Sequence, residues 1–203
     1  MGVFDLVTHN DMCRCRSISH FRHRLRGVTL LELMVVVAIA TILMMVAAPS
    51  FTALMNTQRA NSAATTLLNG MNFARNEAIK RNVRVVLCKS ATSSACTNSG
   101  LWSQGWIVFQ DTNNNAQVDT GEAVLMQQGT AAQGISITGN QNIADYVSYS
   151  ASGTAKLLSG AMQAGTFTIC TTPAQTDSVN QLVLNTTGRP RLDKAAATAC
   201  PVS

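Results

Sequence analysis

Residues 28–48 read VTLLELMVVVAIATILMMVAA, and this stretch decides the class of the chain. It is almost wholly apolar, and Glu32 is its single charged residue. A run of about 20 apolar residues is long enough to form a helix that crosses a membrane. The basic stretch from Arg14 to Arg26 precedes it and favours a cytoplasmic start. The sequence therefore predicts a single-pass transmembrane helix over residues 28–48.

Processing of this segment is expected in front of the apolar run. A secretory signal peptide has a shorter apolar core and a small-residue cleavage site behind it. Here Pro49 and Ser50 follow and a helical pattern continues, so Gly27 is the better candidate. A carboxylate in an apolar span is costly and usually has a partner. Glu32 either stays hydrated near the interface or pairs with a cation, such as an amino terminus created by cleavage after Gly27.

The order Arg26-Gly27, then Val28-Thr-Leu-Leu-Glu32-Leu, resembles the prepilin peptidase site of type IV pilins and type II secretion pseudopilins. Glu32 is fifth after the cut, where the family has its glutamate, while Val28 replaces the usual phenylalanine. The resemblance implies that prepilin peptidase removes a leader, residues 1–27, and that Val28 is N-methylated. It implies an inner-membrane protein with a periplasmic C-terminal domain, assembled later with major and minor pilins into an extracellular pilus. Glu32 would then pair with a neighbouring subunit's amino terminus.

In the mature chain, the spacing of apolar residues changes near residue 82. Apolar residues recur at helical spacing from Phe51 to Ala78, which predicts one long helix over residues 28–82. Beyond it, short runs rich in β-branched and aromatic residues alternate with Gly, Asn, Ser and Thr clusters. The predicted strands are 83–88, 105–110, 123–127, 135–138, 146–150, 167–171 and 181–185. The expected fold is α+β, the pilin fold: a long N-terminal helix packed on an antiparallel β domain over 83–203.

Charge and histidine content exclude several functions. The net charge is +5, but five of the fifteen basic residues lie before residue 27. Residues 83–203 carry six basic and six acidic residues, so this domain is formally neutral. All three histidines lie in the leader, which argues against an enzyme with a catalytic histidine and against a histidine-ligated zinc site. We expect no enzymatic activity.

Four cysteines remain beyond the leader, and an even number in an exported domain suggests two disulfides. Four cysteines allow three connectivities. We favour Cys88–Cys96, which closes a short loop, and Cys170–Cys200, which ties the tail to a strand. A metal site is the rival interpretation, but no C-x-x-C spacing and no histidine supports it.

Residues 111–122 match the calcium loop of EF-hands at most ligand positions. The candidate ligands are Asp111, Asn113, Asn115, Asp119 and Glu122. Ala116 stands where that loop normally has glycine, and strands rather than helices flank the segment. The alternative is a polar hairpin loop, because Asp, Asn and Gly are good turn residues. Calcium is the one cofactor that the sequence suggests.

Trp102 and Trp106 precede this loop and could stack bases, although tryptophans that anchor a core are far commoner. The segment from Leu101 through Glu122 resembles the structural signature of the FimT/GspH subfamily, which implies a strand and hairpin there. The resemblance supports the core interpretation.

The last motif is Gly188-Arg189-Pro190-Arg191, followed by Lys194. Pro190 restricts the segment to an edge strand or an extended tail. In an extended chain Arg189 and Arg191 would project on one side, about 7 Å apart, as phosphate-binding groups. A solvated pair, or one bridged to Asp177 or Asp193, is the alternative.

In the FimT-like minor pilins, a C-terminal G-R-x-R motif is associated with DNA binding in natural transformation. Gly188, Arg189 and Arg191 match this motif. Lys194 is a plausible helper outside the motif. The resemblance thus implies a minor pilin that binds DNA without sequence preference. The alternative is a GspH-like pseudopilin that acts in pseudopilus assembly and type II secretion.

Overall fold

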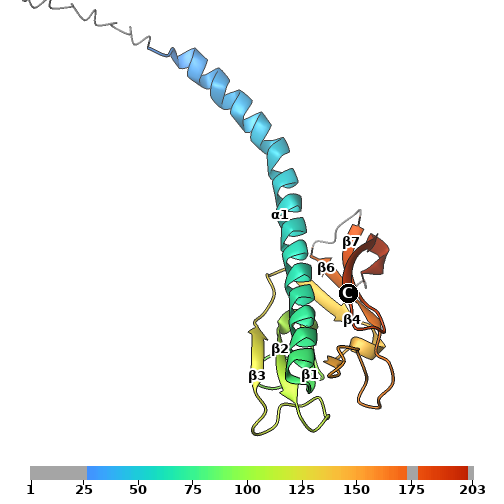
Figure 1. Cartoon of the computed structure of the whole chain (residues 1–203). Coiled ribbons are helices and arrows are strands. Elements are labelled where there is room, and N and C mark those ends of the chain that lie inside the picture. Colours follow the sequence, from blue (N-terminus) through green and yellow to red (C-terminus); the bar gives the residue numbers. More distant parts are fainter. Residues whose placement is uncertain (1–26, 173–177, 201–203) are drawn as a thin grey trace, which may run out of the picture. The chain divides into compact units, whose positions relative to one another are not determined.

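The structure is a computed structural model, and it describes residues 27–172 and 178–200 (Figure 1). Helix α1 covers Leu30–Arg81, close to the predicted 28–82. The chain divides into two compact units, one up to Met44 and one from Met45 onward. The boundary between these units falls inside α1.

The first unit is the apolar start of α1. Thr29 caps the helix: its Oγ1 accepts a hydrogen bond from the backbone N–H of Glu32, at 3.2 Å. The large apolar side chains from Leu30 to Met44 are exposed, and an exposed apolar surface of this size marks an interaction face. Among the described residues, no helix has the length and hydropathy needed to cross a membrane. The structure therefore does not confirm the span predicted for 28–48.

The second unit contains two four-stranded antiparallel sheets. Sheet A has the order β3-β2-β1-β5, with β1 Arg84–Lys89, β2 Trp106–Asp111, β3 Val124–Gln128 and β5 Tyr146–Tyr149. Sheet B has the order β4-β6-β7-β8, with β4 Ile135–Gly139, β6 Gly165–Thr171, β7 Ser178–Leu184 and β8 Pro190–Ala196. Short 3-10 turns η1 (Trp102–Gln104), η2 (Gln141–Ile143) and η3 (Ala197–Ala199) complete the described elements.

The later part of α1 lies against both sheets, as Figure 1 shows for the green segment beside β1–β3 and the segment beside β4, β6 and β7. Its buried stripe repeats every three or four residues. The stripe consists of Ala60, Ala64, Leu67, Met71, Ala74 and Ala78. These side chains form one core cluster with residues of both sheets. Small residues in the stripe allow the helix backbone to approach the sheets closely.

The stripe begins later than the sequence pattern predicted. Phe51, Leu54 and Met55 have the right spacing, but they are exposed. Helical periodicity shows that residues share a face and does not show where along the helix the sheets begin to cover it.

The two tryptophans are core residues, as expected. Trp102 packs edge-on against Phe167 with ring centroids 5.0 Å apart, and Trp106 lies over Gly70 of α1. The indole Nε1 of Trp102 donates to the carbonyl oxygens of Ile143 and Ala144. Both side chains are almost fully buried, so neither forms an exposed platform for bases.

All seven predicted strands exist, mostly shifted by one residue at an end. The two larger differences are in sheet B: β6 starts at Gly165 and β7 at Ser178, earlier than predicted. Too few apolar residues mark these starts: Gly165 and Thr166 begin β6, and in β7 the single buried apolar residue Val179 lies between Ser178 and Asn180, where pairing to β8 extends the strand. The segment after Gly188 forms the outer strand β8, one of the two possibilities left by Pro190.

Candidate functional site

The hairpin between β7 and β8 carries the G-R-x-R motif on an ordered turn. Asn185 organises the turn: its Oδ1 accepts hydrogen bonds from the backbone N–H of Arg189 and from the hydroxyl of Thr187. The N–H of Gly188 donates to the carbonyl oxygen of Asn185 at 2.9 Å. Strand pairing then begins with Leu184 opposite Pro190.

Gly188 is the one position of the motif that is buried, and its backbone requires glycine. Its φ is +79°, which other residues rarely adopt. A Cβ at Gly188 would collide with the carbonyl oxygen of Gly153. The hairpin tip therefore rests directly on the 150–155 turn, which is itself tied to α1 because Arg75 Nε donates to the Gly153 carbonyl at 2.9 Å.

The two arginines of the motif are both exposed. Within the described part of the chain, the guanidinium of Arg189 has no hydrogen-bond or ion-pair partner. Arg191 Nε donates to Asp193 Oδ2 at 2.9 Å, and 70% of the Arg191 side chain is exposed. The bridge to Asp193 considered from the sequence thus exists, and it leaves most of the guanidinium open to solvent.

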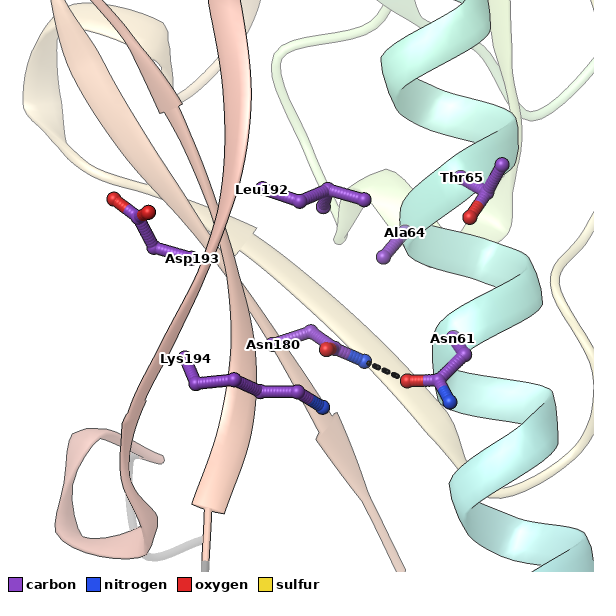
Figure 2. Close-up of a pocket in the computed structure, with 7 residues that line it drawn as sticks. All are labelled: Asn61, Ala64, Thr65, Asn180, Leu192, Asp193 and Lys194. Carbon is purple, nitrogen blue, oxygen red and sulfur yellow. Dashed lines mark hydrogen bonds between the residues drawn. The ribbon is translucent and has the colours of Figure 1, made fainter.

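Lys194 lies on the other face of β8. Because side chains alternate along a strand, Arg191 and Asp193 share one face while Leu192 and Lys194 share the opposite one. Figure 2 shows Asp193 pointing away from α1 and Lys194 extending toward it. The structure therefore separates Lys194 from Arg191, which the sequence alone had grouped together.

Both disulfides have the connectivity favoured from the sequence. Cys88 pairs with Cys96, and Cys170 pairs with Cys200. The second bond joins β6 to the residue that follows η3, so it fixes the segment behind β8 to sheet B.

The candidate calcium loop is held by its own hydrogen bonds. Both carboxylate oxygens of Asp111 accept backbone N–H groups, from Asn115 and Ala116. Asp119 Oδ2 accepts the amides of Asn113 and Asn115, and these hydrogen bonds lower the pKa of Asp119. Among the described residues, no group of three or more His, Cys, Asp or Glu is arranged to hold a metal. The candidate ligands of this loop include asparagine side chains, and calcium binding by them stays a prediction.

Glu122 closes the same loop. One oxygen accepts the N–H and hydroxyl of Thr112, and the other accepts the N–H of Asp119. Partial burial raises the pKa of Glu122, but these hydrogen bonds outweigh burial and the net shift is downward. Ala116 adopts a φ of +56°, the left-handed conformation that glycine normally supplies at this position. The departure from the EF-hand pattern thus leaves the backbone turn in place.

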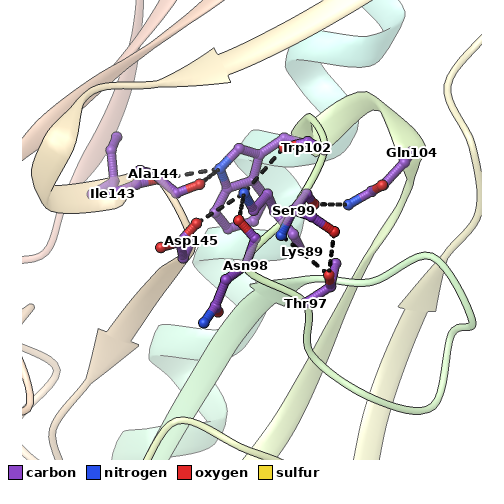
Figure 3. A network of polar contacts seen from close by, with 10 residues as sticks. Lys89, Thr97, Asn98, Ser99, Trp102, Gln104, Ile143, Ala144 and Asp145 are labelled. Atoms are coloured by element: carbon purple, nitrogen blue, oxygen red, sulfur yellow. Dashed lines mark hydrogen bonds and ion pairs between the residues drawn. The ribbon is translucent and has the colours of Figure 1, made fainter.

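A buried lysine that the sequence did not single out joins two loops (Figure 3). Lys89 Nζ lies 2.8 Å from Asp145 Oδ1 and donates to the carbonyl oxygen of Gly100 at 3.1 Å. Only 5% of its side chain is exposed. Its position at the end of a buried strand, next to Cys88, was the sequence feature that could have indicated its burial. Its role here is structural.

The processing residues lie at the start of the described chain. Gly27 and Val28 precede α1 and are exposed, and Glu32 lies in the first turn of the helix. The apolar start of α1, with this glutamate in its first turn, and the disulfide-bonded domain of two sheets are the two parts of the pilin fold.

Comparison with known families identifies the chain more closely. The family model of type II transport protein GspH matches residues 63–188, and the prokaryotic N-terminal methylation motif matches residues 22–48. The first match covers more than half of the chain, so the chain belongs to the GspH family. The family predicted from the sequence is confirmed. No curated protein matches the chain.

A solved structure shares the fold, and a second one is more distantly similar. The type IV minor pilin FimU of Pseudomonas aeruginosa PAO1 is 20% identical, with a TM-score of 0.51, over 74% of this chain and 98% of that one. The minor pseudopilin EpsH of the Vibrio cholerae type 2 secretion system is 13% identical, with a TM-score of 0.47, over 66% of this chain and 96% of that one. The chain thus combines membership of the GspH family and an N-terminal methylation motif with the fold of the minor pilin FimU.

Proposed function

We propose that this chain is a minor pilin of a type IV pilus that binds extracellular DNA through Arg189 and Arg191 during natural transformation. The observation that carries the proposal is the exposure of both guanidinium groups on one ordered hairpin, with the Arg189 guanidinium free of any partner among the described residues. Guanidinium groups bind phosphate oxygens bidentately. A fixed turn keeps both groups in place at little entropic cost.

The expected binding is weak and insensitive to sequence. Contacts to phosphate carry no base information, and two cations per subunit predict a dissociation constant in the non-specific range of ~10⁻⁴ to 10⁻⁶ M or weaker. The formally neutral β domain adds no broad basic field. Several subunits in one pilus would raise the affinity through avidity.

The remaining parts of the proposal follow from the N-terminal motif. Prepilin peptidase cuts after Gly27, the apolar start of α1 holds the subunit in the inner membrane, and assembly with other pilins then carries the domain outside. The exposed apolar side chains of Leu30–Met44 support an interaction face for lipid and for neighbouring helices. The protein acts by binding and assembly rather than by catalysis.

The test is DNA binding by the full chain in detergent, measured by fluorescence anisotropy with a labelled duplex at two salt concentrations. Arg189→Ala/Arg191→Ala should lose most of the binding and make the log–log salt slope shallower by about 0.9 per lost contact. Lys156→Ala removes a cation from the connection between β5 and β6 and serves as the matched control. Equal binding by the double variant and the unchanged chain would contradict the proposal.

A type II secretion pseudopilin is the second candidate, and the name of the matched family favours it. In that role the chain would contribute to pseudopilus assembly and protein secretion, and the unchanged chain should not bind DNA even at low salt. The same anisotropy measurement therefore separates the two functions.

A further inference from the structure

Arg75 of α1 lies close to the hairpin tip that carries Arg189. The Arg75 Nε donates to the carbonyl oxygen of Gly153 at 2.9 Å. A Cβ at Gly188 would collide with the same oxygen, so this carbonyl contacts both the helix side chain and the tip. These short steps place the Arg189 Cα within about 11 Å of Arg75 Nε. The fold therefore brings another arginine, from a distant part of the sequence, next to the motif.

The hydrogen bond to Gly153 uses only one nitrogen of the Arg75 guanidinium. Among the described residues, Arg75 has no other hydrogen-bond or ion-pair partner, and it is partly exposed. A guanidinium has five N–H donors in a fixed planar arrangement. The bond through Nε thus orients the group and leaves Nη1 and Nη2 available to an anion.

The surroundings of Arg75 do not neutralise its charge. Glu77 is the acidic residue nearest to it along the helix, and the Glu77 carboxylate already binds two other cations of α1. Residues 150–155 and residues 185–189, the two segments that meet at the hairpin tip, contain no aspartate or glutamate. Arg75 and Arg189 are thus two neighbouring cations without a carboxylate partner in the described part of the chain.

The turn that contacts both Arg75 and the hairpin tip also carries hydroxyl groups. The hydroxyls of Ser150, Ser152 and Thr154 lie 2.8–3.0 Å from one another. Hydroxyl hydrogens rotate to suit their acceptor, so these groups can donate to a phosphate oxygen in place of one another. Cations accompanied by serine and threonine hydroxyls are common phosphate contacts in proteins that bind nucleic acids.

We propose, on the basis of the DNA binding proposed above, that Arg75 is a third cation of the same site and binds a phosphate of the strand that Arg189 holds. The helix, the 150–155 turn and the hairpin tip then form one phosphate-binding surface. Because Arg75 is anchored on α1, its position does not depend on the order of the C-terminal tail.

The test is fluorescence anisotropy with a labelled duplex and the full chain in detergent, over a series of salt concentrations. Arg75→Gln should weaken binding about fivefold and make the log–log salt slope shallower by about 0.9. Arg75→Lys keeps the charge and should keep the slope. Arg59→Gln is the matched control, because it makes the same change on α1 about 24 Å away along the helix axis. It should leave affinity and slope unchanged.

A purely structural role of Arg75 predicts a different result. Loss of the hydrogen bond to Gly153 alone would lower the thermal midpoint and the affinity but not the slope, which counts phosphate contacts. An unchanged slope in Arg75→Gln, together with binding that Arg189→Ala/Arg191→Ala abolishes, would overturn the role of Arg75 and leave the proposed function standing. No binding by the unchanged chain, or full binding by the double variant, would overturn both.

Discussion

Gly70 of α1 lies directly beneath the indole ring of Trp106 in β2, with no room for a Cβ between them. The contact lets the helix backbone seat against sheet A at the centre of the shared core. It explains a glycine in a helix interior, where it otherwise costs about 1 kcal/mol relative to alanine.

Gly70→Ala should therefore destabilise the domain although alanine is the better helix former. The added methyl group would displace the Trp106 ring, and overpacking of this kind costs about 1–3 kcal/mol. Gly129→Ala is the control, because nothing lies within 4 Å of a Cβ built there. Urea unfolding monitored by tryptophan fluorescence compares the two variants. Equal midpoints would show that the Trp106 ring can move aside without loss of stability.

Gly188→Ala should distort the hairpin tip and weaken DNA binding together with stability. It combines a strained positive φ with a collision against Gly153. Gly160→Ala isolates the strain, since its φ is +86° but its Cβ position is open. Left-handed backbone costs about 1–2 kcal/mol per non-glycine residue, so Gly188→Ala should cost more than Gly160→Ala. Thermal melts and anisotropy on both variants test the difference.

Asp193→Asn should strengthen DNA binding if Arg191 contacts phosphate. The substitution removes the carboxylate that holds Arg191 Nε. An exposed ion pair contributes about 0–1 kcal/mol, so the expected gain in affinity is at most about fivefold. Lower or unchanged affinity would show that the carboxylate does not compete with phosphate. Arg191→Ala/Asp193→Asn is the control and should show no gain over Arg191→Ala.

Glu32→Gln should distinguish the helix cap at residue 32 from the role of the Glu32 charge in pilus assembly. The cap uses the backbone N–H of residue 32 and Thr29 Oγ1, so glutamine retains it. If the Glu32 charge pairs with a neighbouring amino terminus, Glu32→Gln should still lower incorporation into pili. Immunoblots of sheared pili measure incorporation, with whole-cell subunit level as the reference. Normal incorporation would show that the charge of Glu32 is not needed for assembly.

The loop of residues 111–122 should make stability fall in acid. The pKa of Glu122 and that of Asp119 are lowered in the folded state from ordinary values of 4.5 and 3.8. Their contribution is thus fully present above pH 4.5 and is lost as pH falls through the lower folded-state values. Glu122→Gln should flatten the dependence of urea unfolding on pH between 5 and 3. An unaltered slope would assign the acid sensitivity to other carboxylates.

The sequence predicted the elements well where side-chain burial defines them. The stripe Ala60–Ala78 and the central strands β1 and β2 follow directly from apolar periodicity. It did not predict the division into two sheets, because strand partners depend on contacts distant in sequence. The full extent of β7 was also hidden, since Val179 is a single apolar residue between Ser178 and Asn180 and the pairing that extends the strand comes from distant β8.

The residues of the candidate sites were also predictable only where a local sequence pattern marks them. The exposed arginines and both disulfides were visible as motifs and spacings. The direction of the Lys194 side chain could not be predicted. The alternation of side chains along a strand assigns each residue to a face only once the strand is known to begin at Pro190. The place of Arg75 beside the hairpin tip was missed, because its hydrogen bond to Gly153 joins residues 78 positions apart. The lack of a carboxylate three or four residues from Arg75 was the only local sign of an available cation.

No strand pairing joins the two sheets among the described residues, and the buried stripe of α1 packs against both. A load applied along this part of α1 is therefore delivered to both sheets at once. Sliding the stripe breaks many apolar contacts together, whereas a hairpin at the end of a chain can be opened one residue at a time. The domain therefore resists shear along α1 as one body, which suits the place in a pilus that we propose for it.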